Sequence, residues 1–161
     1  MIATSVQSML YWGRRQPRLM LAGAASIGPQ RQRLGNPAMY ASVSPTRIAA
    51  TLTELWSPRV VADVDEHYVK VAKVHGTFGW HRHEHEDELF LVLRGCLRIE
   101  MEAATVILRE GELFVVPKGV RHNPSAQDEC LVMLIERKST LHTGDVVNEK
   151  TRSLAEQLRP V

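Results

Sequence analysis

Six short runs of strand-forming residues follow one another between positions 67 and 136, at a spacing of roughly ten residues. Glycine and proline, which favour turns, stand in most of the breaks between these runs. Many short strands separated by turn signals predict an all-β sandwich or barrel. The predicted strands are 67–74, 88–93, 97–101, 105–108, 113–116 and 130–136.

The order of side chains within the runs indicates which strand faces are buried. Leu97, Ile99 and Met101 alternate with charged residues, a period of two that is typical of a strand with one solvent-exposed face. The runs 89–93 and 113–116 are apolar on both faces, so we expect both strands to be buried on both sides. Because such strands offer a second packing surface, we also expect a homodimer.

Helical signals flank the predicted barrel. Ser44 can cap a helix and Pro45 suits its first turn, while Pro58 ends the apolar stripe that follows. A second short helix is predicted within 151–158. The domain prediction is therefore a tail (1–43), a barrel with its leading helix (44–145) and a C-terminal extension (146–161). The stripe of the first helix consists of Ile48, Leu52, Leu55 and Trp56.

Charge is distributed unevenly along the chain. Residues 1–53 contain six arginines and no Asp or Glu, whereas the remainder carries 14 Lys and Arg against 18 Asp and Glu. Nucleic-acid binding depends on a clustered basic face, and the remainder has no Lys/Arg stripe, so we expect no nucleic-acid partner. No apolar run approaches the ~20 residues that a bilayer span needs, so we expect no membrane insertion.

Two features bear on the cellular compartment. In the tail, Arg14-Arg15 before a short apolar stretch resembles a twin-arginine export signal, and the acid-free composition resembles an organelle transit peptide. A disordered extension is the third interpretation of this tail. Cys96 and Cys130 are too few for a disulfide framework and predict buried thiols in a reducing compartment. We expect a cytoplasmic protein, with export or organelle import as alternatives.

Residues 80–88 concentrate side chains that bind metals, with three histidines in five positions followed by carboxylates. Neutral imidazole binds first-row divalent metals, and carboxylate complements it. Because alternate strand residues share a face, His81 and His83 point the same way, and Glu88 and His122 can join them from later runs. A solvated loop is the alternative, but the stretch leads directly into an apolar run, which favours a four-ligand site at the entrance to a core.

This stretch resembles the first of two signature motifs of the cupin superfamily. The family motif runs His-x-His, three or four residues, Glu, six residues and Gly, after an upstream Gly. Gly76 lies one residue closer to the histidines than the usual upstream glycine. The matching residues are His81, His83, Glu88 and Gly95.

The second cupin motif also has a counterpart in this chain. It runs Gly, five residues, Pro-x-Gly, two residues, His, three residues and Asn. Ala126 stands at the position of the final Asn, which is not a metal ligand in the family pattern, and Asn123 is out of register. The 15 residues between Gly95 and Gly111 match the shortest spacer of compact cupins. The matching residues are Gly111, Pro117, Gly119 and His122.

The resemblance implies a double-stranded β-helix (cupin or jelly-roll barrel) with a metal near its open end. It also implies that His81, His83, Glu88 and His122 hold one divalent transition metal, and side-chain parity points to the same four residues. Mn, Fe, Co, Ni, Cu and Zn all suit three nitrogens and one oxygen. The chain is similar to small single-domain cupins of the phosphomannose-isomerase-like group, a kinship of fold rather than of substrate.

Three functions stay open at this point. The first is a metal-dependent isomerase, lyase or dioxygenase acting on a small oxygen-bearing molecule. The second is a non-catalytic module that binds or senses a small ligand, and the third is a structural barrel with a vestigial site. Two or more polar side chains that converge on the site beyond the four ligands would favour the enzyme, and a wholly aliphatic wall would favour the binding module.

A few further residues have open roles. His85 shares the parity of His81 and His83 but falls in the expected turn, and residues 141–145 form a turn that offers a lid. We expect Phe78 and Trp80 to pack in the core rather than to wall the pocket. Candidates to face the cavity as an acid or a base are Tyr68, Lys70 and Lys73.

Overall fold

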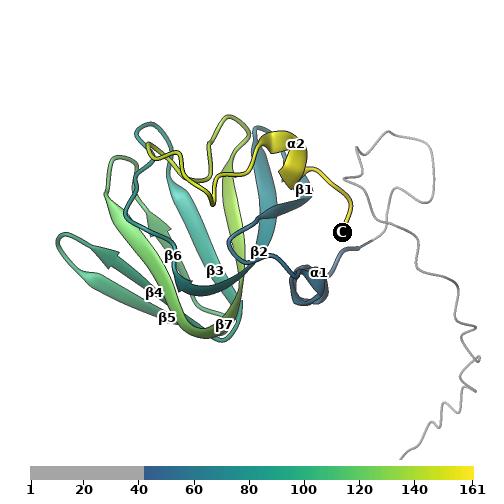
Figure 1. The fold of residues 1–161 in the computed structure, drawn as a ribbon, viewed down its shortest axis with the longest axis horizontal. Helices are drawn as coiled ribbons and strands as arrows, with labels where there is room; N and C mark the ends of the chain where they lie inside the picture. The colour runs from purple at the N-terminus through teal and green to yellow at the C-terminus, as the bar shows by residue number, and fades with distance from the viewer. Residues whose placement is uncertain (1–41) are drawn as a thin grey trace, which may run out of the picture.

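The computed structural model describes residues 42–161, so the predictions for the N-terminal tail lie outside the described residues. Seven antiparallel strands form the body of this part of the chain and confirm the predicted all-β barrel (Figure 1). Among residues 42–161, no helix combines the length and apolar character needed to cross a bilayer. The elements are α1 (Pro45–Thr51), β1 (Arg59–Val64), β2 (His67–Thr77), β3 (Glu88–Arg94), β4 (Cys96–Met101), β5 (Thr105–Arg109), β6 (Leu113–Val116), β7 (His122–Arg137) and α2 (Leu154–Gln157).

The long strand β7 connects the walls of the barrel. One side of β7 pairs with β2 over nearly its whole length, whereas its other side pairs first with β4 and then with β3. β1, β5 and β6 extend the sheet from β2, β4 and β3. β7 is strongly curved, so its two ends lie at the same end of the barrel (Figure 1). The first residue of the strand is His122, and its penultimate residue is Glu136.

The core lies inside the barrel, between the inward faces of these strands. Leu97, Ile99 and Cys130 are fully buried there. A second cluster forms outside the barrel, where Ala49 and Leu52 of the α1 region pack against apolar residues of β2 and β7. Where α1 covers it, the β2–β7 pair is therefore removed from water on both faces, and this burial stabilises the sheet.

The prediction that 113–116 is buried on both sides is wrong. Val116 is buried, but Leu113 and Val115 are 57% and 40% exposed. They stand opposite Leu91 and Leu89 of β3, in a row that points away from the core. Composition alone could not show this exposure, because the α1 helix covers β2 and β7 and leaves the outer face of β6 in solvent.

The leading helix is shorter than predicted. It begins with Pro45, capped by Ser44, and ends at Thr51, so Trp56 lies beyond it. The backbone of Trp56 adopts φ 56°, and its indole Nε1 donates a hydrogen bond of 2.8 Å to the His75 carbonyl oxygen. The ring packs in the barrel core instead of anchoring the helix.

Two further expectations need correction. Cys130 is buried as predicted, but Cys96 is exposed, because Leu97 takes the inward position on β4 and Cys96 alternates with it. β7 begins at His122 rather than at 130, so it includes Pro124. β1 was not predicted as a strand.

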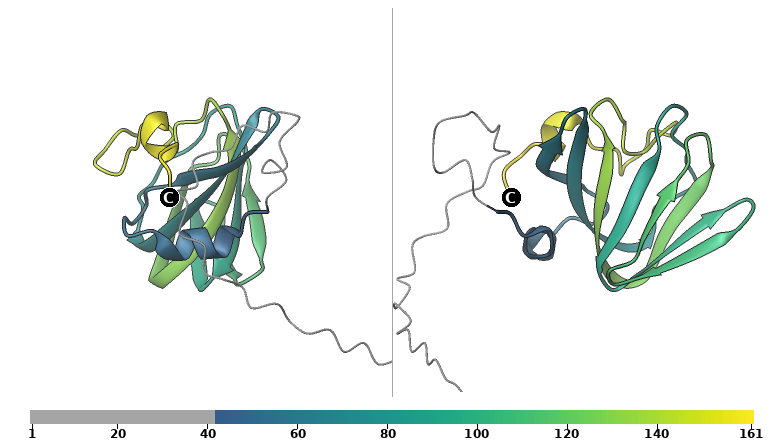
Figure 2. Two further views of the ribbon diagram at one scale, coloured as in Figure 1. Left: turned by 90° about the vertical axis from the view of Figure 1, so that its right-hand side faces the viewer. Right: turned by 180° about the vertical axis from the view of Figure 1, so that it is seen from behind.

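The chain after β7 returns over the end of the barrel at which both ends of β7 lie (Figures 1 and 2). We call residues 138–153 the C-terminal strap. Helix α2 follows it, and begins with a reciprocal capping box between Ser153 and Glu156. The strap therefore covers this end of the barrel.

Candidate metal centre

The four predicted ligands come from three separate segments of the chain. His81 and His83 lie between β2 and β3, Glu88 is the first residue of β3, and His122 is the first residue of β7. All four side chains are at most 5% exposed. One potential ligand atom from each lies within 4.8 Å of the others. The structure thus brings together the set that the sequence singled out.

Main-chain pairing places the histidines. His81 and His122 form an isolated antiparallel bridge, in which each backbone N–H donates to the other's carbonyl oxygen at 3.0 and 2.9 Å. Their ring centroids lie 4.2 Å apart. Gly119, at φ 77°, donates its N–H to the His83 carbonyl oxygen at 2.7 Å, so the Pro117–Gly119 turn holds the second histidine in place.

Hydrogen bonds from Nδ1 of two imidazoles to the backbone turn the second nitrogen of each ring toward the centre. The Nδ1 atoms of His81 and His122 lie 3.0 and 3.1 Å from the carbonyl oxygens of Gly79 and Val120. A carbonyl oxygen can only accept, so each Nδ1 donates to the backbone, and Nε2 of each ring is directed toward the other ligands. Metal-binding histidines commonly donate their second nitrogen to a carbonyl in this way, which fixes the tautomer.

The carboxylate of Glu88 stands between the other ring nitrogens. Its Oε2 atom lies 3.1 Å from His122 Nε2 and 3.2 Å from His83 Nε2. His83 Nε2 is buried and has no hydrogen-bond partner in the part of the chain that the structure describes. A converging set of lone pairs with one unsatisfied nitrogen fits a divalent transition metal bound by three imidazoles and one carboxylate.

Burial and mutual contact shift the pKa values of the set in different directions. Burial lowers the pKa of His81 to about 4, so this imidazole is neutral at physiological pH. Burial alone would raise the pKa of Glu88, but contacts with His122 and His83 outweigh it and hold the pKa below its ordinary value. Burial likewise opposes the charged form of His83, yet the neighbouring Glu88 carboxylate raises its pKa overall. A neutral imidazole and an ionised carboxylate are the forms that bind metal.

A buried asparagine holds the loop that orients His81. Asn123 is 6% exposed, its Oδ1 accepts the Gly79 N–H at 3.0 Å, and its Nδ2 donates to Glu100 Oε2 at 3.0 Å. Since Gly79 in turn accepts from His81, Asn123 fixes the loop that orients this ring. The family pattern gave no hint of this role, because Asn123 is out of register with it.

A buried ion pair lies beside the four ligands. Lys70 Nζ donates to Glu136 Oε2 at 2.7 Å, and both side chains are 1% exposed. Glu136 Oε1 is buried and has no hydrogen-bond partner among the described residues. Burial raises the pKa of Glu136, although the Lys70 ammonium opposes this. From the sequence, Lys70 was a candidate acid or base, whereas Glu136 was not singled out.

A fourth buried histidine, also missed as a site residue, comes from the C-terminal strap. His142 is 5% exposed, and its Nε2 accepts the backbone N–H of Arg152 at 2.7 Å. Burial, followed by the nearby Lys70 charge, lowers the pKa of His142 to about 4, so the ring is neutral. With Nε2 accepting, the single proton of the neutral ring resides on Nδ1.

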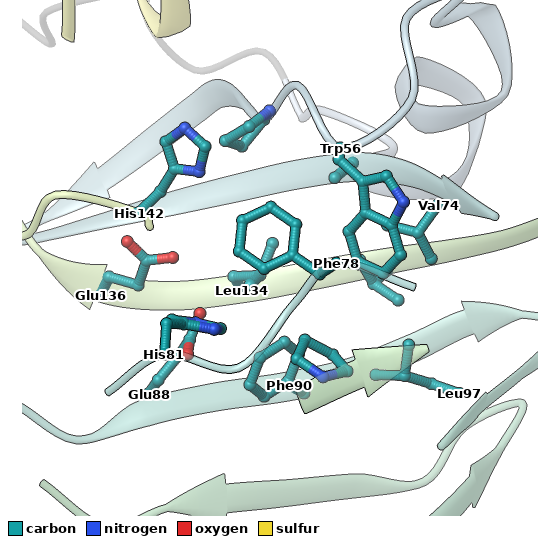
Figure 3. Close-up of a pocket in the computed structure, with 14 residues that line it drawn as sticks. Trp56, Val74, Phe78, His81, Glu88, Phe90, Leu97, Leu134, Glu136 and His142 are labelled. Carbon is teal, nitrogen blue, oxygen red and sulfur yellow. The ribbon is translucent and has the colours of Figure 1, made fainter. Parts of the chain in front are cut away.

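Two of the four ligands, His81 and Glu88, line one cavity of about 30 Å³ together with Glu136 and His142. Figure 3 shows that the cavity has two unlike ends. His81, Glu88, Glu136 and His142 gather at one end, and aromatic and aliphatic side chains surround the other. The apolar end is lined by Trp56, Val74, Phe78, Phe90, Leu97 and Leu134.

Several sequence candidates lie away from the cavity. His85 is exposed in the turn before β3 and does not join the four ligands. Trp80 is 41% exposed, so the expectation that it packs in the core is wrong, whereas Phe78 is buried and lines the cavity. Tyr68, Lys70 and Lys73 are not among the cavity-lining residues. Lys70 is linked to the cavity by its ion pair with Glu136, and Lys73 pairs with Glu129 at 3.2 Å.

Comparison with known proteins agrees with this geometry. Residues 67–136 match the family described as the Cupin domain. The Bacillus subtilis protein YdbB is 32% identical over 79 residues, which cover 48% of this chain and 70% of YdbB.

Solved structures show the same fold. A cupin-2 domain containing protein from Shewanella frigidimarina is 38% identical, with a TM-score of 0.58 over 60% of this chain and 94% of that chain. Hydroquinone 1,2-dioxygenase from Sphingomonas sp. TTNP3, solved with 4-hydroxybenzoate bound, is 17% identical, with a TM-score of 0.57 over 70% of this chain and 83% of that chain, and shows likeness of fold alone. On the residues matched and the identity to its relatives, this chain belongs to the cupin superfamily.

Proposed function

We propose that this cupin binds one divalent transition metal through His81, His83, Glu88 and His122 and acts as an enzyme on a small oxygen-bearing molecule. The observation that carries the proposal is the buried convergence of four ligand atoms within 4.8 Å of one another. The backbone-oriented tautomers of His81 and His122 support it. Once bound, the metal would supply Lewis-acid polarisation of a ligand oxygen or, as iron(II), dioxygen chemistry.

Polar groups beyond the four ligands favour an enzyme over a passive binding site. Glu136 and His142 both line the cavity, and Lys70 holds one oxygen of the Glu136 carboxylate. The free Oε1 of Glu136 is placed to accept or return a proton of the bound molecule, while its raised pKa suits it to hold that proton. The apolar walls exclude water from this exchange. The proposed reaction types are isomerisation, a lyase reaction and dioxygenation.

A non-catalytic ligand-binding or sensing module is the second candidate. The observation in its favour is the apolar end of the cavity, where aromatic and aliphatic side chains offer contact area without reactive groups. The two candidates share the metal and differ in what Glu136 does. An enzyme loses turnover in Glu136→Gln while it keeps its metal, whereas a binding module shows no turnover in either form.

The metal is tested first, by elemental analysis of protein purified without nickel resin or chelator. We expect about one transition metal per chain, and a loss of more than roughly ten-fold in His81→Ala and in His122→Ala, since each removes one of four ligands. His85→Ala is the matched control, because this exposed histidine lies outside the group. Full metal content in both ligand variants would refute the assignment.

Four broader expectations remain proposals. The apolar outward row of β3 and β6, with Leu113 and Val115 exposed, supports the expected homodimer. Sedimentation that shows a monomer at high concentration would contradict it. We also propose that the protein resides in the cytoplasm and is related to the phosphomannose-isomerase-like group. The last of these proposals is that it has no nucleic-acid partner.

A further inference from the structure

The C-terminal strap is attached to the same segment that carries His81 and His83. The backbone N–H of Arg82 donates to Asp145 Oδ1 at 3.0 Å, and the backbone N–H of Asp145 donates to the Arg82 carbonyl oxygen at 3.0 Å. Lys150 Nζ donates to the carbonyl oxygens of Thr77 and Phe78 at 2.6 and 2.8 Å. The strap therefore lies over the candidate metal centre, outside the residues that match the cupin family.

A glycine permits this close approach. Gly144 adopts φ 58°, and a Cβ atom on it would overlap the backbone carbonyl of Arg82. Only a residue without a side chain fits both the conformation and the contact. Gly144, two residues after His142, thus allows the strap to pack directly against the Arg82 backbone.

His142 carries a hydrogen-bond donor to the cavity. Its Nε2 accepts from the Arg152 backbone, so Nδ1 bears the proton, and the side chain lines the polar end of the cavity (Figure 3). At the same end, Glu136 Oε1 is a buried acceptor with no partner within residues 42–161. A donor and an unsatisfied acceptor that line one small cavity are complementary to a hydroxyl group, which accepts one hydrogen bond and donates another.

We propose that His142 is a specificity-determining residue for a small hydroxylated molecule. His142 Nδ1 donates a hydrogen bond to the hydroxyl oxygen of that molecule, and the hydroxyl group donates its own hydrogen to Glu136 Oε1. This inference rests on the proposed function and names its substrate class. The opposite, apolar end of the cavity receives the hydrocarbon part of that molecule. Because the strap brings His142 to the site, recognition of the hydroxyl depends on a segment beyond the barrel strands.

Two substitutions separate recognition from simple anchoring of the strap. In His142→Gln the side-chain oxygen can replace Nε2 as acceptor for Arg152, but nothing donates from the position of Nδ1. In His142→Asn the amide nitrogen can donate from the position of Nδ1, but the Arg152 N–H loses its partner. Recognition of a hydroxyl therefore requires Asn rather than Gln, and a purely anchoring role requires the reverse.

The test uses the full chain loaded with Zn²⁺ and two matched probes, hydroxyacetone and acetone, titrated by ligand-observed NMR. We expect native protein to bind hydroxyacetone roughly ten-fold more tightly than acetone, the size expected for one added buried hydrogen bond. This preference should disappear in His142→Gln and persist in His142→Asn. An equal affinity of native protein for both probes, or an unchanged preference in His142→Gln, would overturn the inference.

Zinc content and thermal unfolding, measured on the same samples, distinguish the possible failures. Native protein that takes up no zinc contradicts the proposed metal centre and, with it, this inference. Native protein that holds zinc and shows no hydroxyl preference contradicts only the role of His142. Both variants should retain the zinc content and cooperative unfolding of native protein, because His142 is not one of the four ligands.

Discussion

The barrel and the C-terminal strap both bring histidines to one cavity, but they hold them by different means. In the barrel, His81 and His122 sit on paired backbones, with reciprocal hydrogen bonds of 3.0 and 2.9 Å. In the strap, His142 lies in a turn region that is held by a few side-chain contacts and one close glycine approach. The difference indicates a rigid metal centre with a ligand-recognition group on a more easily opened segment.

Strand pairing explains why the two parts should differ in stability. Opening β7 exposes the apolar core on several strands at once, whereas opening the strap breaks only the few contacts that the strap itself makes. Local opening free energies in a protein range from near zero up to the free energy of global unfolding. We expect the barrel site to lie at the upper end of this range and the strap at the lower end.

The largest effect is expected from the buried ion pair of the barrel. Lys70→Met leaves the Glu136 carboxylate buried without its cation, and should lower the free energy of unfolding by about 3–5 kcal/mol. Lys70→Met combined with Glu136→Leu removes both charges, and should recover most of this loss. Urea denaturation of the two variants and native protein measures the effect. A Lys70→Met variant as stable as native protein would show that the pair does not hold the barrel together.

A pH titration of stability sharpens the comparison through His142. Its pKa is about 4 in the folded protein and near 6.5 in the unfolded chain. Between these values the unfolded chain binds a proton that the folded protein does not, so stability falls as the pH drops from 6.5 toward 4, by about 3 kcal/mol in total. Above pH 6.5 this contribution is fully present.

The measurement compares native protein with His142→Gln, both free of metal, by urea denaturation at pH 7.5 and pH 4.5. The other histidines contribute equally to both proteins, so the difference isolates His142. We expect the variant to lose less stability on acidification. The same loss in both proteins would mean that His142 is not held neutral by burial under the strap.

The smallest effect on global stability is expected from Gly144→Ala. Because a Cβ there would overlap the Arg82 carbonyl, the strap should detach locally while the barrel stays folded. Hydrogen exchange should become much faster at the Asp145 amide, which donates to Arg82, and stay unchanged at the Val132 amide in β7. Gly111→Ala is the matched control, since Gly111 also has a positive φ, 81°, but no neighbour near its Cβ position. An equal rate of hydrogen exchange at the Asp145 amide in Gly144→Ala and Gly111→Ala would contradict the packing of the strap against Arg82.

The barrel and its four candidate ligands were predictable from sequence because strand alternation and motif spacing act over short distances. Glu136 had a detectable signal: Cys130, Val132 and Leu134 share its face on β7, so a carboxylate ends a buried row. His142 had no comparable signal, since its burial depends on contacts between the strap and residues some sixty positions earlier.

Other features also depended on tertiary packing. The row of Leu113 and Val115 looked buried by composition, yet only the position of α1 over β2 and β7 decides which outer faces are covered. Trp56 continued the helical stripe in sequence, but the helix ends at Thr51 and the indole turns into the barrel. Periodicity identifies apolar faces, and the arrangement of elements decides which of them meet.

The central claim is that one metal ion lies among His81, His83, Glu88 and His122. The most direct test is a crystal structure of metal-loaded native protein, with anomalous diffraction recorded at the absorption edge of the metal identified by elemental analysis. We predict a single anomalous peak within bonding distance, about 2.0–2.2 Å for zinc, of three imidazole nitrogens and one Glu88 oxygen. An anomalous peak elsewhere, or an ion that contacts only one of the four side chains, would contradict the account.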